Sequence, residues 1–120
     1  MNIDKFREVI KQREYISQVS QDEWAEGIEE CQKKEIEILS EDISSTMEFL
    51  KTECTAEEFS WISEVFEDII EANPNKELIQ CYKELVDKFP EEAETYHIVD
   101  SCIKSAEAIL KWEEEHGKES

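Results

Sequence analysis

The sequence predicts an all-α fold, an irregular series of antiparallel αα-hairpins forming a small solenoid of the HEAT or armadillo kind, with about six helices. Apolar residues recur every three to four positions along most of the chain, which is the spacing of one helix face. The chain holds only two glycines and two prolines, too few for the turns of an all-β fold. A helical bundle is the alternative, but the expected helices are too numerous and too unequal for four matched ones.

Apolar stripes and polar ends define the first three helices. The first covers about residues 3–19, and the second opens at Asp22 and runs to about Leu39. Ser40 is a candidate N-cap for the third, which ends near Lys51, because a serine hydroxyl can accept a hydrogen bond from a free first-turn amide. The inward-facing residues of these helices are apolar: Ile3, Phe6, Val9, Ile10, Ile16, Val19, Trp24, Ile28, Cys31, Ile38, Leu39, Ile43, Met47 and Leu50.

A capping box predicts the start of the fourth helix. Thr55 offers a hydroxyl to the free amides, and Glu58 stands at the position from which a carboxylate bonds back to the cap. The helix runs as one piece to about Ala72, because Pro74 cannot continue it. Its apolar face contains Phe59, Ile62, Val65, Phe66, Ile69 and Ile70.

The last two helices are separated by a proline. Asn75 can cap the fifth helix, about 76–89, and Pro90 stops it. A short turn at 91–95 leads to a last helix over about 97–112. Residues 1–112 are therefore expected to form a single all-helical domain, followed by a frayed acidic tail at 113–120.

The chain is strongly acidic, with 32 Asp and Glu against 13 Lys and Arg and a formal net charge of −19. This charge argues against direct binding of nucleic acid, which requires basic patches for the phosphates, and it would speed the encounter with a cationic partner. The N-terminal segment MNIDKFREVI has no apolar stretch typical of a signal peptide, and no apolar run is long enough to span a membrane. We therefore expect a cytoplasmic protein.

Four cysteines, Cys31, Cys54, Cys81 and Cys102, are widely spaced and form no CxxC pair. In a reducing compartment they are expected to be small core residues. A four-cysteine zinc site is the alternative, but it lacks the usual paired spacing.

The fourth helix carries a conspicuous acidic stripe. At about 100° per residue, Glu57, Glu64, Asp68 and Glu71 fall opposite the apolar face, and Trp61 lies on the same stripe. An aromatic side chain rimmed by carboxylates suits a basic partner, since Trp is enriched among interface hot spots and attracts Arg and Lys through its ring. These five residues are the candidate partner-binding site.

An ordinary solvated face remains the alternative, although such faces usually mix the two signs of charge. Like pairs at Glu53–Glu57, Glu64–Asp68 and Glu67–Glu71 and carboxylates near the negative end of the helix dipole together disfavour the helix by about 1–2 kcal/mol. A rival acidic patch lies on the second helix at residues 22–30, with Asp22, Glu26, Glu29 and Glu30 near Trp24.

The sequence displays no catalytic signature, so we expect a protein that is not an enzyme and that needs no cofactor or metal. Gly-rich phosphate loops, GxSxG and HExxH motifs and EF-hand loops are missing from it. Glu94-x-x-His97 and Glu113-x-x-His116 match the ligand spacing of di-iron bundles. They lie at opposite ends of one predicted helix, roughly 28 Å apart at 1.5 Å per residue, and cannot share a site.

Two segments resemble a known family. ECTAEEFSWISEVFEDII and KELVDKFPEEAETYHIVDSCIKSAEAIL are similar to segments of immunity proteins from bacterial polymorphic toxin systems, including contact-dependent growth inhibition, and the resemblance covers roughly residues 36–110. It implies a cytoplasmic protein that binds a cognate toxin domain, often a nuclease, and blocks its active site. It transfers no residue roles, because immunity interfaces vary between relatives.

The sequence therefore predicts an inhibitor that neutralises a basic toxin domain, expected to be a nuclease, through an acidic surface, without contacting nucleic acid or membrane itself. The alternative is a helical scaffold or adaptor of another pathway that binds proteins or peptides in a solenoid groove. A metal-dependent enzyme is a third, weaker alternative. The sequence leaves the oligomeric state open.

Overall fold

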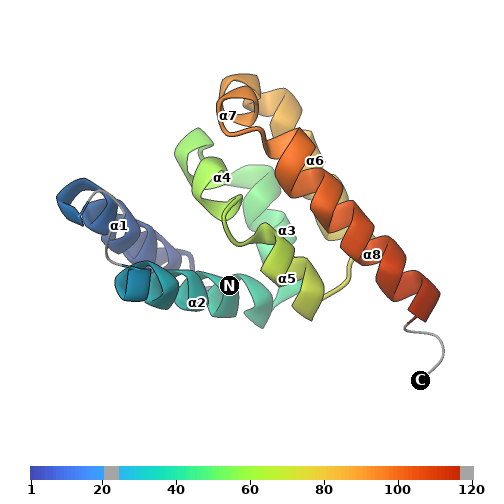
Figure 1. Cartoon of the computed structure of the whole chain (residues 1–120), viewed down its shortest axis with the longest axis horizontal. Coiled ribbons are helices and arrows are strands. Elements are labelled where there is room, and N and C mark those ends of the chain that lie inside the picture. The colour runs from blue at the N-terminus through green and yellow to red at the C-terminus, as the bar shows by residue number, and fades with distance from the viewer. Residues whose placement is uncertain (21–24, 117–120) are drawn as a thin grey trace.

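The computed structural model describes residues 1–20 and 25–116, and within them every regular element is a helix (Figure 1). The predicted all-α class is confirmed. The short final elements include a π-helical segment, η1, that leads directly into α8. In chain order the elements are α1 (Ile3–Ser20), α2 (Ala25–Glu41), α3 (Ile43–Thr52), α4 (Ala56–Ile62), α5 (Phe66–Ala72), α6 (Lys76–Lys88), α7 (Pro90–Thr95), η1 (Ile98–Ile103) and α8 (Lys104–His116).

The helices follow one another in three groups along the longest axis of a molecule measuring 46 × 31 × 26 Å (Figure 1). The hairpin of α1 and α2 forms one end, α3 to α5 form the middle, and α6 to α8 form the other end. Helix α2 packs on α3 and α5, while α3 packs on α6, α4 on α7 and α5 on α8. This order of packing is consistent with the short stack of hairpins expected from the sequence.

Aromatic side chains fill the contacts between the groups. Phe6 of α1 meets Phe49 of α3 edge to face, with ring centroids 5.6 Å apart. Tyr82 of α6 stacks on Phe66 at 4.1 Å and leans on Phe59 at 4.9 Å. All five side chains are buried, and aromatic pairs in such geometries contribute about 0.5–1.5 kcal/mol each beyond the burial of their area.

Three helix caps can be compared with the predicted ones. The Thr55–Glu58 capping box and the Asn75 cap are both present. The Ser40 cap is wrong: α2 continues through Ser40, and the cap of α3 is Asp42, whose carboxylate accepts from the Ser45 N–H at 3.4 Å. The expected start of the second helix at Asp22 lies outside the described residues.

The fourth helix is broken, where the sequence predicts one continuous piece. Helix α4 ends at Ile62, a turn follows at 63–65, and α5 starts at Phe66. The Tyr82 hydroxyl donates to the Phe59 carbonyl at 2.8 Å, so that carbonyl bonds the Ser63 N–H only at 3.3 Å. The next amide, that of Glu64, bonds three residues back instead of four. A buried side chain inserted into the backbone ladder is a known cause of helix breaks.

The C-terminal third also differs from the prediction. A short helix, α7, forms at 90–95 in place of a turn, because Pro90 is tolerated at the first position of a helix, where its missing N–H is not needed. His97 then takes a left-handed conformation with φ 52° and separates α7 from η1. Helix α8 continues beyond Trp112 to His116.

The four cysteines are buried and carry free thiols, as expected for small core residues. Burial raises the pKa of the Cys54 and Cys102 thiols to about 12, which keeps both protonated and unreactive at neutral pH. Within residues 1–20 and 25–116, none of the helices combines the length and apolar content needed to cross a bilayer.

Candidate functional site

The break in the fourth helix divides the predicted acidic stripe into two parts. Trp61 and Glu64 turn toward α1, where Arg13 meets both of them. The Arg13 Nη2 and Nε atoms lie 2.8 Å and 3.1 Å from the two oxygens of the Glu64 carboxylate. The same guanidinium lies over the Trp61 ring, 4.9 Å from its centroid. These two predicted partner-binding residues are therefore engaged within their own chain.

Glu57 also faces α1, across from Glu14. The Trp61 indole N–H donates to Glu14 Oε1 at 3.2 Å. A hydrogen bond with the Glu14 carboxyl is the main cause that raises the pKa of Glu57, and partial desolvation adds to it. The neighbouring Glu14 carboxyl therefore favours the protonated form of Glu57.

A second ion pair closes the other end of the same contact. Arg7 Nε donates to Glu58 Oε2 at 2.8 Å, and Arg7 Nη2 donates to the Glu53 carbonyl at 3.2 Å. Glu58 is buried even though it belongs to the capping box, and its hydrogen bond is the main cause that raises the pKa of Arg7. We call this set of polar contacts of Arg7, Arg13 and Glu14 with residues 57–64 the joint between α1 and α4. It involves Glu57, Trp61 and Glu64, the N-terminal part of the predicted site.

Beneath this joint lies a carboxyl that the sequence analysis did not single out. Glu35 of α2 has no exposed surface, and neither of its oxygens has a hydrogen-bond partner. Burial and the nearby Glu64 carboxylate raise its pKa to about 8, while Arg13 opposes the shift. Glu35 is therefore a neutral acid at physiological pH. Its position four residues after Cys31 and three before Ile38 places it on the apolar face of α2, and this spacing is the sequence signal that could have marked it as buried.

The other part of the stripe stays open. Asp68 and Glu71 of α5 are exposed, as is Glu67 beside them. Among the described residues, no ion pair joins any of the three to a basic side chain. We call Glu67, Asp68 and Glu71 the α5 acidic surface.

The sequence predicts that repulsion among the carboxylates of the stripe destabilises the fourth helix. The break at 63–65 reduces this destabilisation. Glu67 and Asp68 stand in the first turn of α5, at the positive end of the helix dipole, where carboxylates are favoured. Glu64 is paired with Arg13, and Glu53 caps α3 instead of belonging to α4. Of the three predicted like pairs, Glu67–Glu71 alone lies within one helix.

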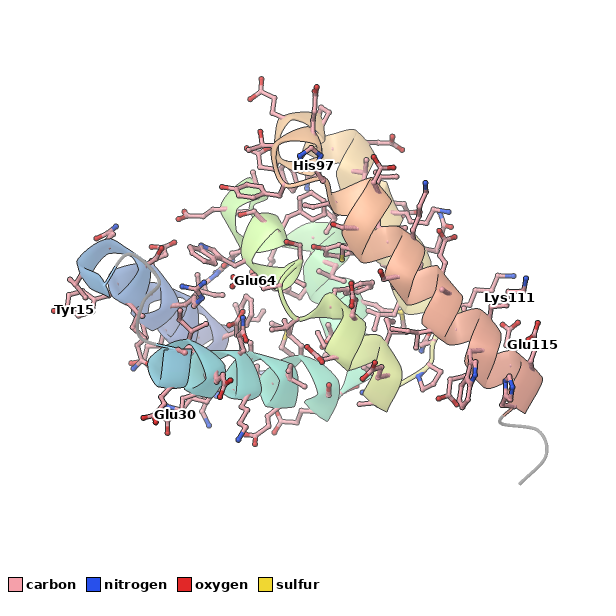
Figure 2. The ribbon with its side chains drawn as sticks, in the orientation of Figure 1. Tyr15, Glu30, Glu64, His97, Lys111 and Glu115 are labelled. Atoms are coloured by element: carbon pink, nitrogen blue, oxygen red, sulfur yellow. The ribbon has the colours of Figure 1, made fainter. Side chains whose placement is uncertain are left out.

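Helices α2 and α8 flank α5 on its two sides and add exposed carboxylates (Figure 1). Glu30 and Glu37 are exposed on α2, and Glu114 and Glu115 are exposed on α8; Glu30 and Glu115 are labelled in Figure 2. Of the rival patch at residues 22–30, Glu26, Glu29 and Glu30 are exposed on α2, whereas Asp22 and Trp24 lie outside the described residues.

Helix α8, which packs on α5, carries an exposed aromatic residue. Trp112 of α8 is 56% exposed and stacks on the His116 ring at 4.3 Å, and the His116 Nδ1 lies 2.8 Å from the Trp112 carbonyl. The run Glu113–Glu115 follows it directly. This acidic run is a sequence signal that could have marked Trp112 as a candidate contact residue, but residues 113–120 were expected to form a frayed tail.

The two Glu-x-x-His pairs are separated, one beside η1 and the other at the end of α8. In the part of the chain that the structure describes, no three His, Cys, Asp or Glu side chains gather closely enough to hold a metal ion.

Comparison with protein-family models, with curated proteins and with solved structures finds no match to this chain.

Proposed function

We propose that this protein is an immunity-type inhibitor that binds a basic toxin domain through the α5 acidic surface, with Trp112 of the adjacent helix α8 as an aromatic anchor. The observation that carries the proposal is the contrast between two sets of carboxylates. Glu58 and Glu64 are neutralised by arginines of α1. Glu67, Asp68 and Glu71 are exposed and have no such partner among the described residues.

The charge of the whole chain supports the same conclusion. With a formal net charge of −19, the field around the molecule attracts a cationic protein and raises its association rate. Unpaired carboxylates need no internal ion pair to be broken before they meet a lysine or arginine. Trp112 is exposed on α8, which packs on α5, and its ring can stack with a partner's arginine.

A nuclease is the toxin class that this surface fits best. An enzyme that cleaves nucleic acid must present Lys and Arg to the phosphates of its substrate. An acidic protein can occupy that basic surface and thereby exclude the substrate, while electrostatic complementarity supplies a fast association. The inhibitor then needs no catalytic group of its own.

The test uses the product of the gene adjacent to this one, because an immunity gene lies beside its toxin gene. We expect co-expression to restore growth to cells that make that product, and the two purified proteins to form a complex. Asp68→Lys/Glu71→Lys should weaken the complex at least about tenfold, mainly by slowing association, with a larger effect at low salt. Surface plasmon resonance at two salt concentrations measures both rates.

A matched control changes the net charge by the same amount elsewhere. Glu8→Lys/Glu48→Lys replaces exposed residues of α1 and α3 and should reduce the association rate only slightly. If both double variants weaken the complex equally, the α5 acidic surface is not the contact. If the neighbouring product neither binds nor is neutralised, the proposed function is wrong.

A further inference from the structure

A groove runs along the C-terminal group, with α6 and α7 on one side and η1 and α8 on the other. It consists of three adjoining hollows, which share Val86 and Val99 at one junction and Lys83 and Glu107 at the next. The middle hollow has a volume of 380 Å³. His97 and Lys111, both labelled in Figure 2, mark the two ends of the groove.

The two ends of the groove carry opposite charge. The hollow beside His97 is lined by Glu94 and Asp100 and by no lysine or arginine. The hollow at the other end is lined by Lys76, Lys83 and Lys111 against two glutamates. We call Glu94 and Asp100 the acidic end, and Lys76 and Lys111 the basic end. A concentration of lysines is unusual for a chain in which acidic residues outnumber basic ones by 32 to 13.

The floor of the groove is apolar at both ends. Val99 is 42% exposed beside the acidic end. Leu110 is half-buried beside the basic end and packs on the core from α8. The acidic end lacks strong internal compensation, because the nearest pair, Lys104 Nζ to Asp100 Oδ1, spans 3.5 Å between two largely exposed side chains and such pairs contribute about 0–1 kcal/mol.

We propose that this groove is the contact surface of a homodimer, and that its occupant is the same groove of a second copy of this chain. In a two-fold symmetric contact, every pair of residues occurs twice: if residue i of the first copy touches residue j of the second, then residue j of the first copy touches residue i of the second. Two grooves laid antiparallel therefore place the acidic end of each copy on the basic end of the other. Val99 of one copy then faces Leu110 of the other, and both lose exposed apolar area.

Charge complementarity favours a second copy over other occupants. A cationic partner is repelled by the lysines at one end, and an anionic partner is repelled by the carboxylates at the other end. The groove of an identical chain matches both ends at once. The remaining carboxylates of two copies repel one another, but this repulsion is screened beyond a Debye length of about 8 Å at about 0.15 M salt, whereas contacts within the groove are shorter than that.

Two reversed variants test the proposal without a third protein. Lys76→Glu/Lys111→Glu makes the groove acidic throughout, and Glu94→Lys/Asp100→Lys makes it predominantly basic. All four residues are exposed, so helicity measured by circular dichroism should not change. Sedimentation velocity at about 0.15 M salt and protein concentrations up to about 200 μM detects a dimer with a micromolar Kd.

We expect the unmodified chain to dimerise, each variant to dimerise at least about tenfold more weakly, and an equimolar mixture of the two variants to form a heterodimer. In that mixture both contacts again join opposite charges. The control Lys5→Glu/Lys33→Glu alters the net charge as much as the first variant does, at exposed positions of α1 and α2, and should change the dimer Kd less than about threefold.

Three results overturn the proposal. The first is that the unmodified chain remains monomeric over the whole concentration range. The second is that the two variants dimerise as well as the unmodified chain, and the third is that the mixed variants fail to form a heterodimer. None of these results bears on toxin binding by the α5 acidic surface, because the four substituted residues lie outside it.

Discussion

At the scale of single residues, Glu35 is the least expected feature of the molecule. A carboxyl without exposed surface and without a hydrogen-bond partner is disfavoured in its charged form by several kcal/mol. It stays neutral, and Arg13 holds the Glu64 carboxylate above it in a bidentate pair. Because Glu35 is uncharged, it does not repel the Glu64 carboxylate, and the Arg13–Glu64 pair of α1 can form above it.

The sign of the pH dependence follows from the direction of the shift. The pKa of Glu35 is about 8 in the folded chain, against an ordinary value of 4.5 for the solvated side chain. Below pH 4.5 the group is protonated in both the folded and the unfolded chain and has no effect. As the pH rises from 4.5 to about 8, the unfolded chain releases the proton and the folded chain keeps it. The unfolded state is therefore increasingly favoured, by about 1.4 kcal/mol per pH unit.

Glu35→Gln removes this titration while it keeps the shape of the protonated side chain. We expect the variant to be more stable than the unmodified chain by about 3 kcal/mol at about pH 7, and the difference to vanish at about pH 4.5. Urea denaturation at several pH values between these two, followed by circular dichroism, measures the change. Glu37→Gln, at an exposed position of the same helix, is the control and should show no such pH-dependent gain. Equal gains in both variants would contradict the assignment of a buried neutral acid.

At the scale of elements, the division of the fourth helix depends on Tyr82. The aromatic ring of this residue is fully buried between Phe59 and Phe66, and its hydroxyl is bonded to the Phe59 carbonyl. Burial raises the pKa of the hydroxyl well above its ordinary value, so it stays a donor at all physiological pH values. One side chain of α6 thus fixes where α4 ends.

Tyr82→Phe keeps the packed ring and removes the donor. We expect the variant to lose about 1 kcal/mol of unfolding free energy, the usual contribution of one intramolecular hydrogen bond. Urea denaturation measures the loss, and hydrogen exchange at the Ser63 amide reports on the turn. Tyr15→Phe is the control: Tyr15 is 64% exposed, and its substitution should change stability by less than about 0.5 kcal/mol. A Tyr82→Phe variant of unchanged stability would show that the hydroxyl does not hold the break.

The contrast between correct and wrong predictions also belongs to this scale. The capping box at Thr55 and the Asn75 cap act through residues at most three positions away, so the sequence reveals them. The break at 63–65 is imposed by a residue of another helix, and no local breaker such as Gly or Pro marks it. Asp42 takes the role assigned to Ser40, because both are good caps and only the observed extent of α2 distinguishes them.

The sequence predicts the positions of the acidic residues on the fourth helix, but it does not predict which of them another helix covers. A helical wheel places residues on a face, and it does not reveal which other helix covers that face. Arg13 of α1 contacts both Trp61 and Glu64, and Glu14 accepts a hydrogen bond from Trp61. The sequence of residues 56–72 contains no signal that predicts these contacts. Asp68 and Glu71 are exposed, and within the described residues no basic side chain of α1 forms an ion pair with them.

At the scale of the whole molecule, self-repulsion opposes folding. The formal net charge is −19, and few ion pairs oppose this repulsion within residues 1–20 and 25–116. The pairs of Lys83 with Glu107 and of Lys104 with Asp100 join exposed side chains. Such exposed pairs contribute little. Long-range repulsion therefore dominates the electrostatic part of stability.

Salt should consequently stabilise the protein. We expect the unfolding free energy, measured with urea as an uncharged denaturant, to rise by about 1–2 kcal/mol when the NaCl concentration increases from about 20 mM to about 300 mM. The variant Glu67→Gln/Asp68→Asn/Glu71→Gln, with three fewer carboxylates, should show a smaller rise. A decrease of stability with salt in the unmodified chain would mean that attractive ion pairs outweigh the repulsion.

The sequential packing of the three groups bears on how the chain acquires its structure during synthesis. The hairpin of α1 and α2 packs on the middle group, and the middle group packs on the last one. Contacts that join neighbouring stretches of chain are associated with fast folding, and domains are made from the N-terminus onward on the ribosome. Each hairpin can therefore dock on the preceding one as it emerges, so that apolar surface is covered soon after translation exposes it.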